Sequence, residues 1–120
     1  MSFVPELEEI LGTSLITDPD ITASYSKDQA PFAPFTQAAA VLLARSSEEI
    51  SKALVFCSER KVPVVTRGAG SGLSGGANAD SQSLIVSLEK MNQILEIDPA
   101  NQLARVQAGV INLDLDIAVK

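Results

Sequence analysis

The chain has 120 residues, a formal net charge of −6 and a hydrophobic fraction of 46%. The length fits one ordinary domain, and this much apolar material supports a core, which excludes a disordered chain. The acidic charge argues against nucleic acid as a partner, because affinity for phosphate backbones needs a basic face.

Three features bear on location. Cys57 is the only cysteine, so no intrachain disulfide forms and the fold does not depend on an oxidising compartment. The longest apolar run, Ala38–Ala44, is far shorter than the roughly 20 residues that span a bilayer. Acidic residues such as Glu6 stand where a secretion signal would be basic. We expect a cytoplasmic chain without a transmembrane segment, and peripheral attachment to a membrane through partners stays open.

Residues 1–37 read as an N-terminal helix followed by an irregular segment. Helical spacing of apolar residues predicts a short helix over residues 3–11. Residues 17–37 are rich in polar residues and proline, and we expect them to lie irregularly over the surface of a larger unit. Burial of aromatic side chains would anchor them, with Tyr25, Phe32 and Phe35 as candidates.

A strand–helix–strand unit follows. The apolar run 39–44 predicts a buried strand, and Ser46 before two acidic residues predicts a helix start. Pro63 is expected to end that helix, and the β-branched stretch 62–66 predicts a second strand parallel to the first. The apolar face of the helix is predicted to comprise Ile50, Ala53, Leu54 and Cys57.

The remaining pattern predicts a strand over residues 83–88, with Glu89 and Lys90 as surface charges after it. Residues 94–97 and 104–108 flank the turn Asp98–Asn101 and predict a β-hairpin. An amphipathic pattern then begins near Asn112, and we expect that helix to be cut off at Lys120.

The stretch 63–76, PVVTRGAGSGLSGG, carries the strongest chemical signal. Glycines leave backbone N–H groups unshielded, and successive N–H groups can converge on an anion. Arg67 adds a positive charge at the loop entrance, and no acidic residue occurs between Arg60 and Ala79. The loop therefore favours a phosphate or pyrophosphate ligand.

Other interpretations of this loop are weaker. A P-loop requires a lysine after the glycines, and none follows here. Residues 70–75 match the GxGxxG pattern of nicotinamide-binding Rossmann domains, but that pattern must open a helix, and residues 76–83 lack helical periodicity. A glycine loop with a purely structural role is the third alternative.

The loop resembles the pyrophosphate loop of the flavoprotein family that includes vanillyl-alcohol oxidase and p-cresol methylhydroxylase. Two sequence segments are similar to the branch of this family that contains the glycolate oxidase FAD-linked subunit and D-lactate dehydrogenase. They are PVVTRGAGSGLSGGA and LIVSLEKMNQILEIDPANQLARVQAGV. The earlier segment ITASYSKDQAPF also resembles that branch.

The resemblance implies an α+β fold, the N-terminal subdomain of a p-cresol methylhydroxylase-type FAD-binding domain, with residues 38–120 as its first, truncated part. It implies noncovalent FAD, since the chain has no histidine and Cys57 reads as a buried hydrophobe. A glycine at position 109 would lie near the flavin by the family pattern, or serve as a turn glycine. The implied pyrophosphate contacts are Arg67, Gly68, Ala69, Gly70, Ser71, Gly72, Leu73, Ser74 and Gly75.

The implied activity is oxidation of a 2-hydroxy acid, of the glycolate or D-lactate type, to the 2-oxo acid. The substrate would bind only the full-length enzyme, and electron-transfer subunits are further expected partners. We assign no catalytic residue and no metal ligand within this chain. The alternative is a non-catalytic truncated remnant that does not retain FAD.

Overall fold

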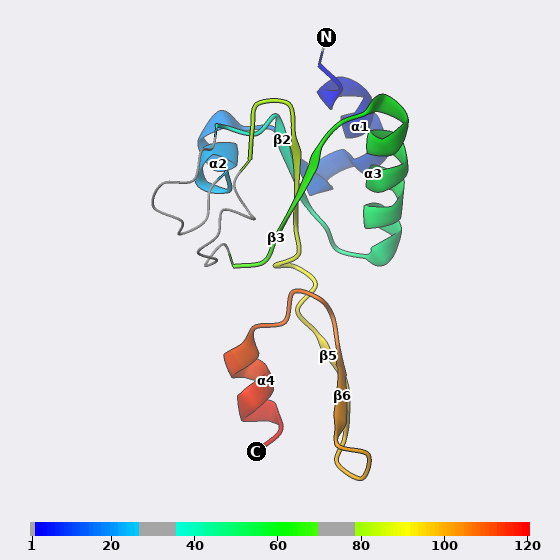
Figure 1. Cartoon of the computed structure of the whole chain (residues 1–120), viewed down its shortest axis with the longest axis vertical. Coiled ribbons are helices and arrows are strands. Elements are labelled where there is room, and N and C mark those ends of the chain that lie inside the picture. The colour runs from blue at the N-terminus through cyan, green and yellow to red at the C-terminus, as the bar shows by residue number, and fades with distance from the viewer. Residues whose placement is uncertain (1, 27–35, 70–78) are drawn as a thin grey trace.

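The computed structural model describes residues 2–26, 36–69 and 79–120. A mixed sheet flanked by helices forms one part, and a hairpin with a helix beside it projects from the sheet (Figure 1). The molecule measures 53 × 34 × 23 Å and has a radius of gyration of 15.7 Å. A compact domain of this length would have a radius of gyration of about 13.6 Å, so the projecting part makes the chain elongated.

The sheet has the strand order β1-β2-β4-β3, in which β1 is antiparallel and the other strands are parallel. Its members are β1 (Leu15–Ile16), β2 (Ala40–Leu43), β3 (Val64–Arg67) and β4 (Leu84–Ser87). The predicted parallel strands are confirmed, but β2 and β3 are not neighbours, because β4 lies between them. All four residues of β4 are buried, as expected for a central strand covered on both faces.

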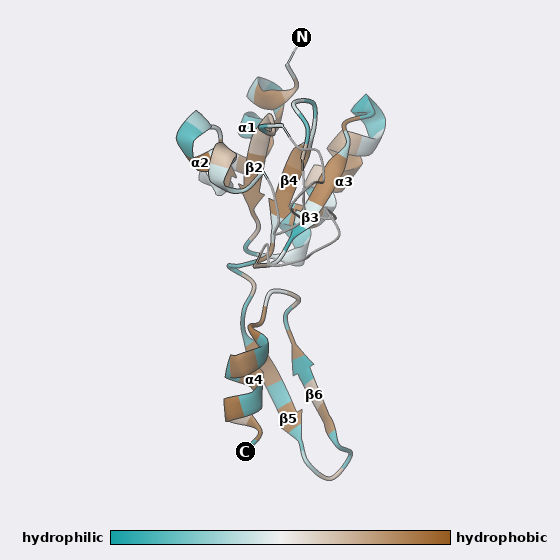
Figure 2. Cartoon of the chain, turned by 60° about the vertical axis from the view of Figure 1, so that its left-hand side comes forward, coloured by the Kyte–Doolittle hydropathy of each residue, from teal (hydrophilic) through white to brown (hydrophobic). Residues whose placement is uncertain are grey.

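Strict alternation along β2 and β4 divides the core between the two faces of the sheet. Leu42 and Leu84 pack with the helices α1 (Val4–Leu11) and α3 (Ser47–Arg60) on one face. Val41 and Ile85 pack on the other face with Ala79 and Tyr25. Figure 2 shows these strands as the most hydrophobic part of the sheet.

Helix α3 begins and ends on local signals. The hydroxyl of Ser46 accepts a hydrogen bond from the backbone N–H of Glu49 at 3.2 Å, as the sequence predicts for an N-cap. The helix ends at Arg60, and Lys61 takes a left-handed conformation with φ 56°. The chain thus leaves the helix before Pro63. The prediction that Leu54 belongs to the apolar face is wrong, because this side chain is 44% exposed. Phe56, which was not predicted to face the core, is buried.

The stretch expected to be irregular contains the helix α2 (Pro19–Ser24), so that expectation is wrong in part. The carboxylate of Asp18 accepts a hydrogen bond from the N–H of Asp20 at 2.9 Å, and Pro19 occupies the first helical turn. A short 3₁₀ turn, η1 (Gly12–Ser14), precedes β1. Phe32 and Phe35 lie outside the described residues.

The projecting part comprises β5 (Ile94–Asp98), β6 (Leu103–Val106) and α4 (Asn112–Ala118), and we call it the hairpin unit. The predicted hairpin and helix are confirmed, with β5 and β6 antiparallel. The side chain of Asn101 donates to Asp98 at 2.8 Å and its backbone N–H donates at 3.2 Å; these hydrogen bonds close the turn and lower the pKa of Asp98. Large apolar side chains stand exposed on this unit: Leu95, Ile97, Leu103, Leu113, Ile117 and Val119.

Replacing Leu84 by alanine tests the central position of β4. Leu84 is fully buried, so Leu84→Ala should lower the free energy of unfolding by about 2–5 kcal/mol. The control Leu54→Ala removes a 44% exposed side chain and should change it by no more than about 0.5 kcal/mol. Urea denaturation followed by circular dichroism measures both values. Equal losses in the two variants would contradict this burial.

Candidate functional site

The parallel strands β2, β3 and β4 all end at the same edge of the sheet. Leu43 and Arg67 are both in register with Ser87 there. Ligands of open α/β sheets bind outside the carboxyl ends of the strands. Residues 68–76, which we call the glycine-rich stretch, begin at this edge immediately after Arg67, the last residue of β3.

A cleft of about 710 Å³ opens at this carboxyl edge, between the ends of β3 and β4 and the backbone that leads from β6 into α4. Four segments line it: the end of α2, the exit of β3, the exit of β4 and the loop from β6 to α4. The lining residues are Ser24, Tyr25, Arg67, Gly68, Ala69, Glu89, Ala108, Gly109, Val110, Ile111, Asn112 and Leu113.

Part of the predicted pyrophosphate site lines this cleft. Arg67, Gly68 and Ala69 lie on its wall, and a Cβ built on Gly68 would meet nothing within 4 Å. The backbone at the first glycine of the motif therefore has open space beside it. The other predicted contacts, Gly70, Ser71, Gly72, Leu73, Ser74 and Gly75, lie outside the described residues.

Arg67 is held against Tyr25. Its guanidinium Nη1 donates to the backbone oxygen of Tyr25 at 3.2 Å, and its Cζ lies 5.5 Å from the centroid of the Tyr25 ring. A guanidinium over an aromatic face gains electrostatic attraction and loses rotational freedom. The positive charge predicted at the loop entrance therefore has a defined position on the cleft wall.

Tyr25 also donates its hydroxyl hydrogen to the Oε1 of Glu89, which follows β4. This hydrogen bond, together with burial and the charge of Glu89, raises the pKa of Tyr25 to about 12. Glu89 is exposed, as expected for a residue just after a strand, but it also lines the cleft. Sequence reasoning missed the pair because its members are 64 positions apart.

At Gly109 the backbone of the chain lies against the backbone of Leu88 and Met91. Its N–H donates to the backbone oxygen of Met91 at 2.8 Å, and a Cβ built on it would lie 1.7 Å from the backbone oxygen of Leu88. No side chain fits at that distance, so the backbone that leads into α4 packs directly on the exit of β4. This contact places the backbone between β6 and α4 where it forms one wall of the cleft.

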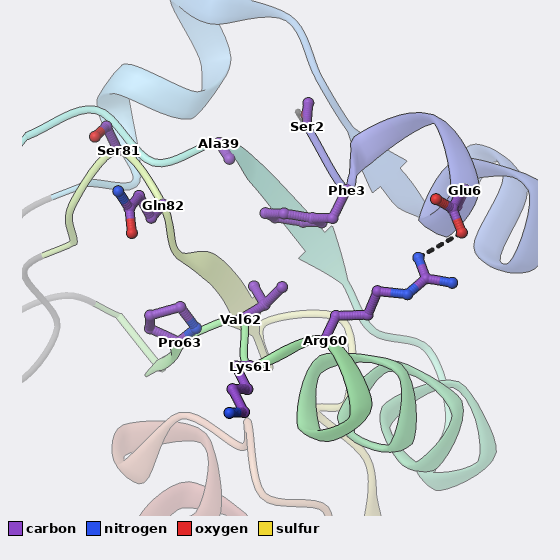
Figure 3. Close-up of a pocket in the computed structure, with 10 residues that line it drawn as sticks. All are labelled: Ser2, Phe3, Glu6, Ala39, Arg60, Lys61, Val62, Pro63, Ser81 and Gln82. Carbon is purple, nitrogen blue, oxygen red and sulfur yellow. Dashed lines mark ion pairs between the residues drawn. The ribbon is translucent and has the colours of Figure 1, made fainter.

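A second hollow, of about 500 Å³, lies at the amino edge of the parallel strands (Figure 3). Arg60 and Glu6 form an ion pair at its rim, and the Arg60 guanidinium also lies 4.4 Å from the centroid of the Phe56 ring. Lys61 and Gln82 line the same hollow. It is therefore at the opposite edge of the sheet from Gly68 and Ala69.

Other chemistry is sparse among the described residues. Cys57 is 2% exposed, inside the core as predicted, and burial raises the pKa of its thiol. The described ranges contain no group of three or more acidic or cysteine side chains placed to hold a metal ion. Across these same ranges no helix has the length and apolar character needed to cross a membrane.

The Gly109→Ala variant should be clearly less stable than the unsubstituted chain. The added methyl group meets the backbone oxygen of Leu88, and relief by backbone movement should cost at least about 1–3 kcal/mol. Gly68→Ala is the matched control, because its methyl group enters open space. Thermal unfolding measures both, and an unchanged melting temperature for Gly109→Ala would refute the close approach.

Ionisation of Tyr25 reports its bond to Glu89. Tyr25 is the only tyrosine and the chain has no tryptophan, so near-ultraviolet absorbance follows this one group. Its pKa rises from 10.0 to about 12 on folding, so this pair stabilises the fold fully below pH 10 and loses that effect as pH rises toward 12.

Glu89→Ala should move the ionisation midpoint of Tyr25 back toward 10, because it removes both the hydrogen-bond acceptor and the carboxylate charge. Glu96→Gln, an exposed carboxylate on β5, serves as the control and should leave the midpoint in place. A midpoint near 10 in the unsubstituted folded chain would show that the contact is absent.

Comparison with known proteins identifies the family. Residues 38–120 match the family model described as "FAD binding domain". The chain is 48% identical over 81 residues to the glycolate oxidase subunit GlcD of Bacillus subtilis, covering 68% of this chain and 17% of that protein. It is 37% identical over 121 residues to D-lactate dehydrogenase of Archaeoglobus fulgidus, covering 98% of this chain and 26% of that enzyme.

The fold comparison agrees. The structure superposes on p-cresol methylhydroxylase with substrate bound at a TM-score of 0.80 and 26% identity, covering 97% of this chain and 23% of that one. The chain thus spans about a quarter or less of the length of these relatives. The mixed sheet with its hairpin is a p-cresol methylhydroxylase-type arrangement, as the sequence predicts. This chain belongs to the FAD-binding domain family of flavin-linked oxidoreductases, and its cofactor is FAD.

Proposed function

We propose that the cleft at the carboxyl edge of the sheet holds the pyrophosphate of FAD, with residues 67–75 as the phosphate-binding segment. The observation that carries the proposal is the position of Arg67 and Gly68. The guanidinium of Arg67 and the unshielded backbone of Gly68 line one cleft at the carboxyl edge of the parallel strands. The contributions of Gly70, Ser71, Gly72, Leu73, Ser74 and Gly75 stay predictions from the sequence.

The residues present suit a dinucleotide. The cleft, at about 710 Å³, is within the roughly 300–1,000 Å³ usual for cofactor pockets. It combines a guanidinium from Arg67 with the amide side chain of Asn112 and exposed backbone at Gly68 and Ala69. Hydrogen bonds between such donors and a phosphate are charge-assisted, and each contributes about 1.5–3 kcal/mol at best.

We propose that the FAD is bound noncovalently. The chain has no histidine. Its one cysteine, Cys57, is buried in α3 within the core, away from the cleft lining. This chain therefore offers no histidine, and no cysteine at the site, for the attachment of a flavin.

For the complete protein we propose oxidation of a 2-hydroxy acid to the 2-oxo acid. The two relatives described above are named for glycolate and D-lactate, which are both 2-hydroxy acids. FAD supplies the two-electron acceptor for this chemistry, and the protein supplies binding and orientation. The Bacillus relative is named as a subunit, which supports electron-transfer subunits as partners.

This chain's share of that function is cofactor binding. None of its residues is assigned to the substrate or to proton abstraction. The division at residue 37, the cytoplasmic location and the truncated character expected from the sequence stay predictions. A nicotinamide-binding Rossmann domain is no longer a competing hypothesis, because the chain belongs to the FAD-binding domain family.

Titration with FAD and, in parallel, with ADP tests the proposal. Tyr25 lines the cleft and is the only tyrosine in a chain without tryptophan, so tyrosine fluorescence reports this site alone. Both ligands should change that fluorescence and raise the melting temperature, because each carries the diphosphate and binds the folded state.

The double variant Gly70→Val, Gly72→Val should weaken binding of both ligands at least tenfold, since loss of one charge-assisted bond costs about 1.5–3 kcal/mol. Ala104→Val is the volume control, on exposed strand β6. Undiminished binding by the double variant would overturn the pyrophosphate assignment. A chain that binds neither ligand would support the alternative of a non-catalytic remnant.

A further inference from the structure

The residue pair Tyr25–Ser26 contacts the chain on both sides of the glycine-rich stretch. The guanidinium of Arg67, before the glycines, donates to the backbone oxygen of Tyr25 at 3.2 Å. The backbone N–H of Ala79, after them, donates to the backbone oxygen of Ser26 at 2.8 Å. Neighbouring α-carbons are about 3.8 Å apart, so these two carbonyls hold groups from either end of the stretch close together.

The pair is itself anchored in a buried network. The hydroxyl of Ser26, which is fully buried, donates to the backbone oxygen of Thr22 at 2.6 Å and accepts from the N–H of Ala38 at 3.1 Å. The side chain of Gln37 donates to the Thr22 hydroxyl at 2.8 Å. Fully satisfied buried networks of this kind are rigid. The two carbonyls are therefore fixed relative to the start of β2.

Glu89 adds a third connection. It follows β4, accepts the hydroxyl hydrogen of Tyr25 and lines the same cleft as Arg67 and Gly109. Tyr25 thus connects the end of α2, the exit of β3 and the exit of β4, which are the segments that frame the carboxyl edge.

We propose that Tyr25, Ser26 and Glu89 form a clasp that positions the phosphate-binding segment, with Tyr25 as its central positioning residue. The clasp fixes the Arg67 guanidinium at the start of the segment and the backbone of Ala79 beyond its end. This inference rests on the proposed function, since it names residues that position the binding segment rather than contact the phosphate.

The hydroxyl of Tyr25 has a second effect on the cleft. Glu89 is a carboxylate in a cleft proposed to receive a diphosphate, where an unpaired negative charge would repel the ligand. Donation from Tyr25 holds that carboxylate on the cleft wall. Loss of the hydroxyl frees the carboxylate and loosens the ring that stacks with Arg67. Both consequences weaken the binding of an anion.

The test uses the FAD dissociation constants of the unsubstituted chain and of Tyr25→Phe, Glu89→Ala, Glu89→Gln and the double variant Tyr25→Phe, Glu89→Ala. Flavin fluorescence gives the constants, since Tyr25 is itself replaced. Tyr25→Phe should weaken FAD binding by about three- to tenfold, the range of a partly exposed hydrogen bond to a charged group. Glu89→Ala should weaken FAD binding by less, because it also removes the negative charge that repels the diphosphate. Glu96→Gln, on β5, is the control for a lost negative charge.

The double variant separates positioning from general destabilisation. If Tyr25 acts through Glu89, the double variant binds FAD no more weakly than the worse single variant. Glu89→Gln should stay within about twofold of the unsubstituted chain, because its amide oxygen still accepts the hydroxyl hydrogen. Urea denaturation of each variant confirms that the chain is folded at the temperature of the titration.

Three results would overturn the clasp: FAD binding unchanged in Tyr25→Phe, additive losses in the double variant, or Glu89→Gln as weak as Glu89→Ala. The unsubstituted chain distinguishes this failure from failure of the proposed function. If it binds FAD while any of those three results is found, only the clasp fails. If it binds neither FAD nor ADP, the proposed function fails and the clasp fails with it.

Discussion

The parallel pairing of β3 with β4 is the constraint on which the rest of this structure depends. Two neighbouring parallel strands need a connection that returns from the carboxyl edge of one to the amino edge of the next. Here the chain leaves β3 at Gly68 and enters β4 after Ser83, and Ala79 packs against the face of the sheet opposite α3. The glycine-rich stretch therefore starts at the edge where the cleft opens, and it follows a half-buried strand that is paired with the fully buried β4.

The second constraint is the contact of Gly109 with the exit of β4. It brings the backbone that precedes α4 against Leu88, and the same loop lines the cleft. The proposed cofactor site consequently lies between the sheet and the hairpin unit, and residues of both line it. If FAD binds in this cleft as we propose, loss of the Gly109 contact removes one wall of its site and should lower the affinity for FAD.

Features with local causes could be predicted from the sequence. The cap at Ser46, the turn at Asp98, and the alternating or continuous apolar runs of β2, β4 and the hairpin depend on residues close together in the chain. The short helix α2 also carried a local signal, Asp18 before Pro19, that the polar composition of the stretch obscured.

Features that arise from tertiary packing could not be predicted in this way. No pattern within the strands shows that β4 separates β2 from β3, since that order depends on which strand is covered on both faces. Leu54 and Phe56 have similar helical context, and the exposure of one and burial of the other depend on where α1 packs. At the site, Arg67 and Gly68 were predicted, whereas Tyr25 and Glu89 meet only through the fold.

The most direct test of the central claim is the position of the diphosphate relative to the two edges of the sheet. Backbone amide resonances of the isotope-labelled chain, followed during titration with ADP, distinguish the edges. Our account predicts that the resonances of Gly68, Ala69 and Gly109 at the carboxyl edge shift with a common dissociation constant. Shifts confined to Lys61 and Gln82 at the amino-edge hollow would contradict it.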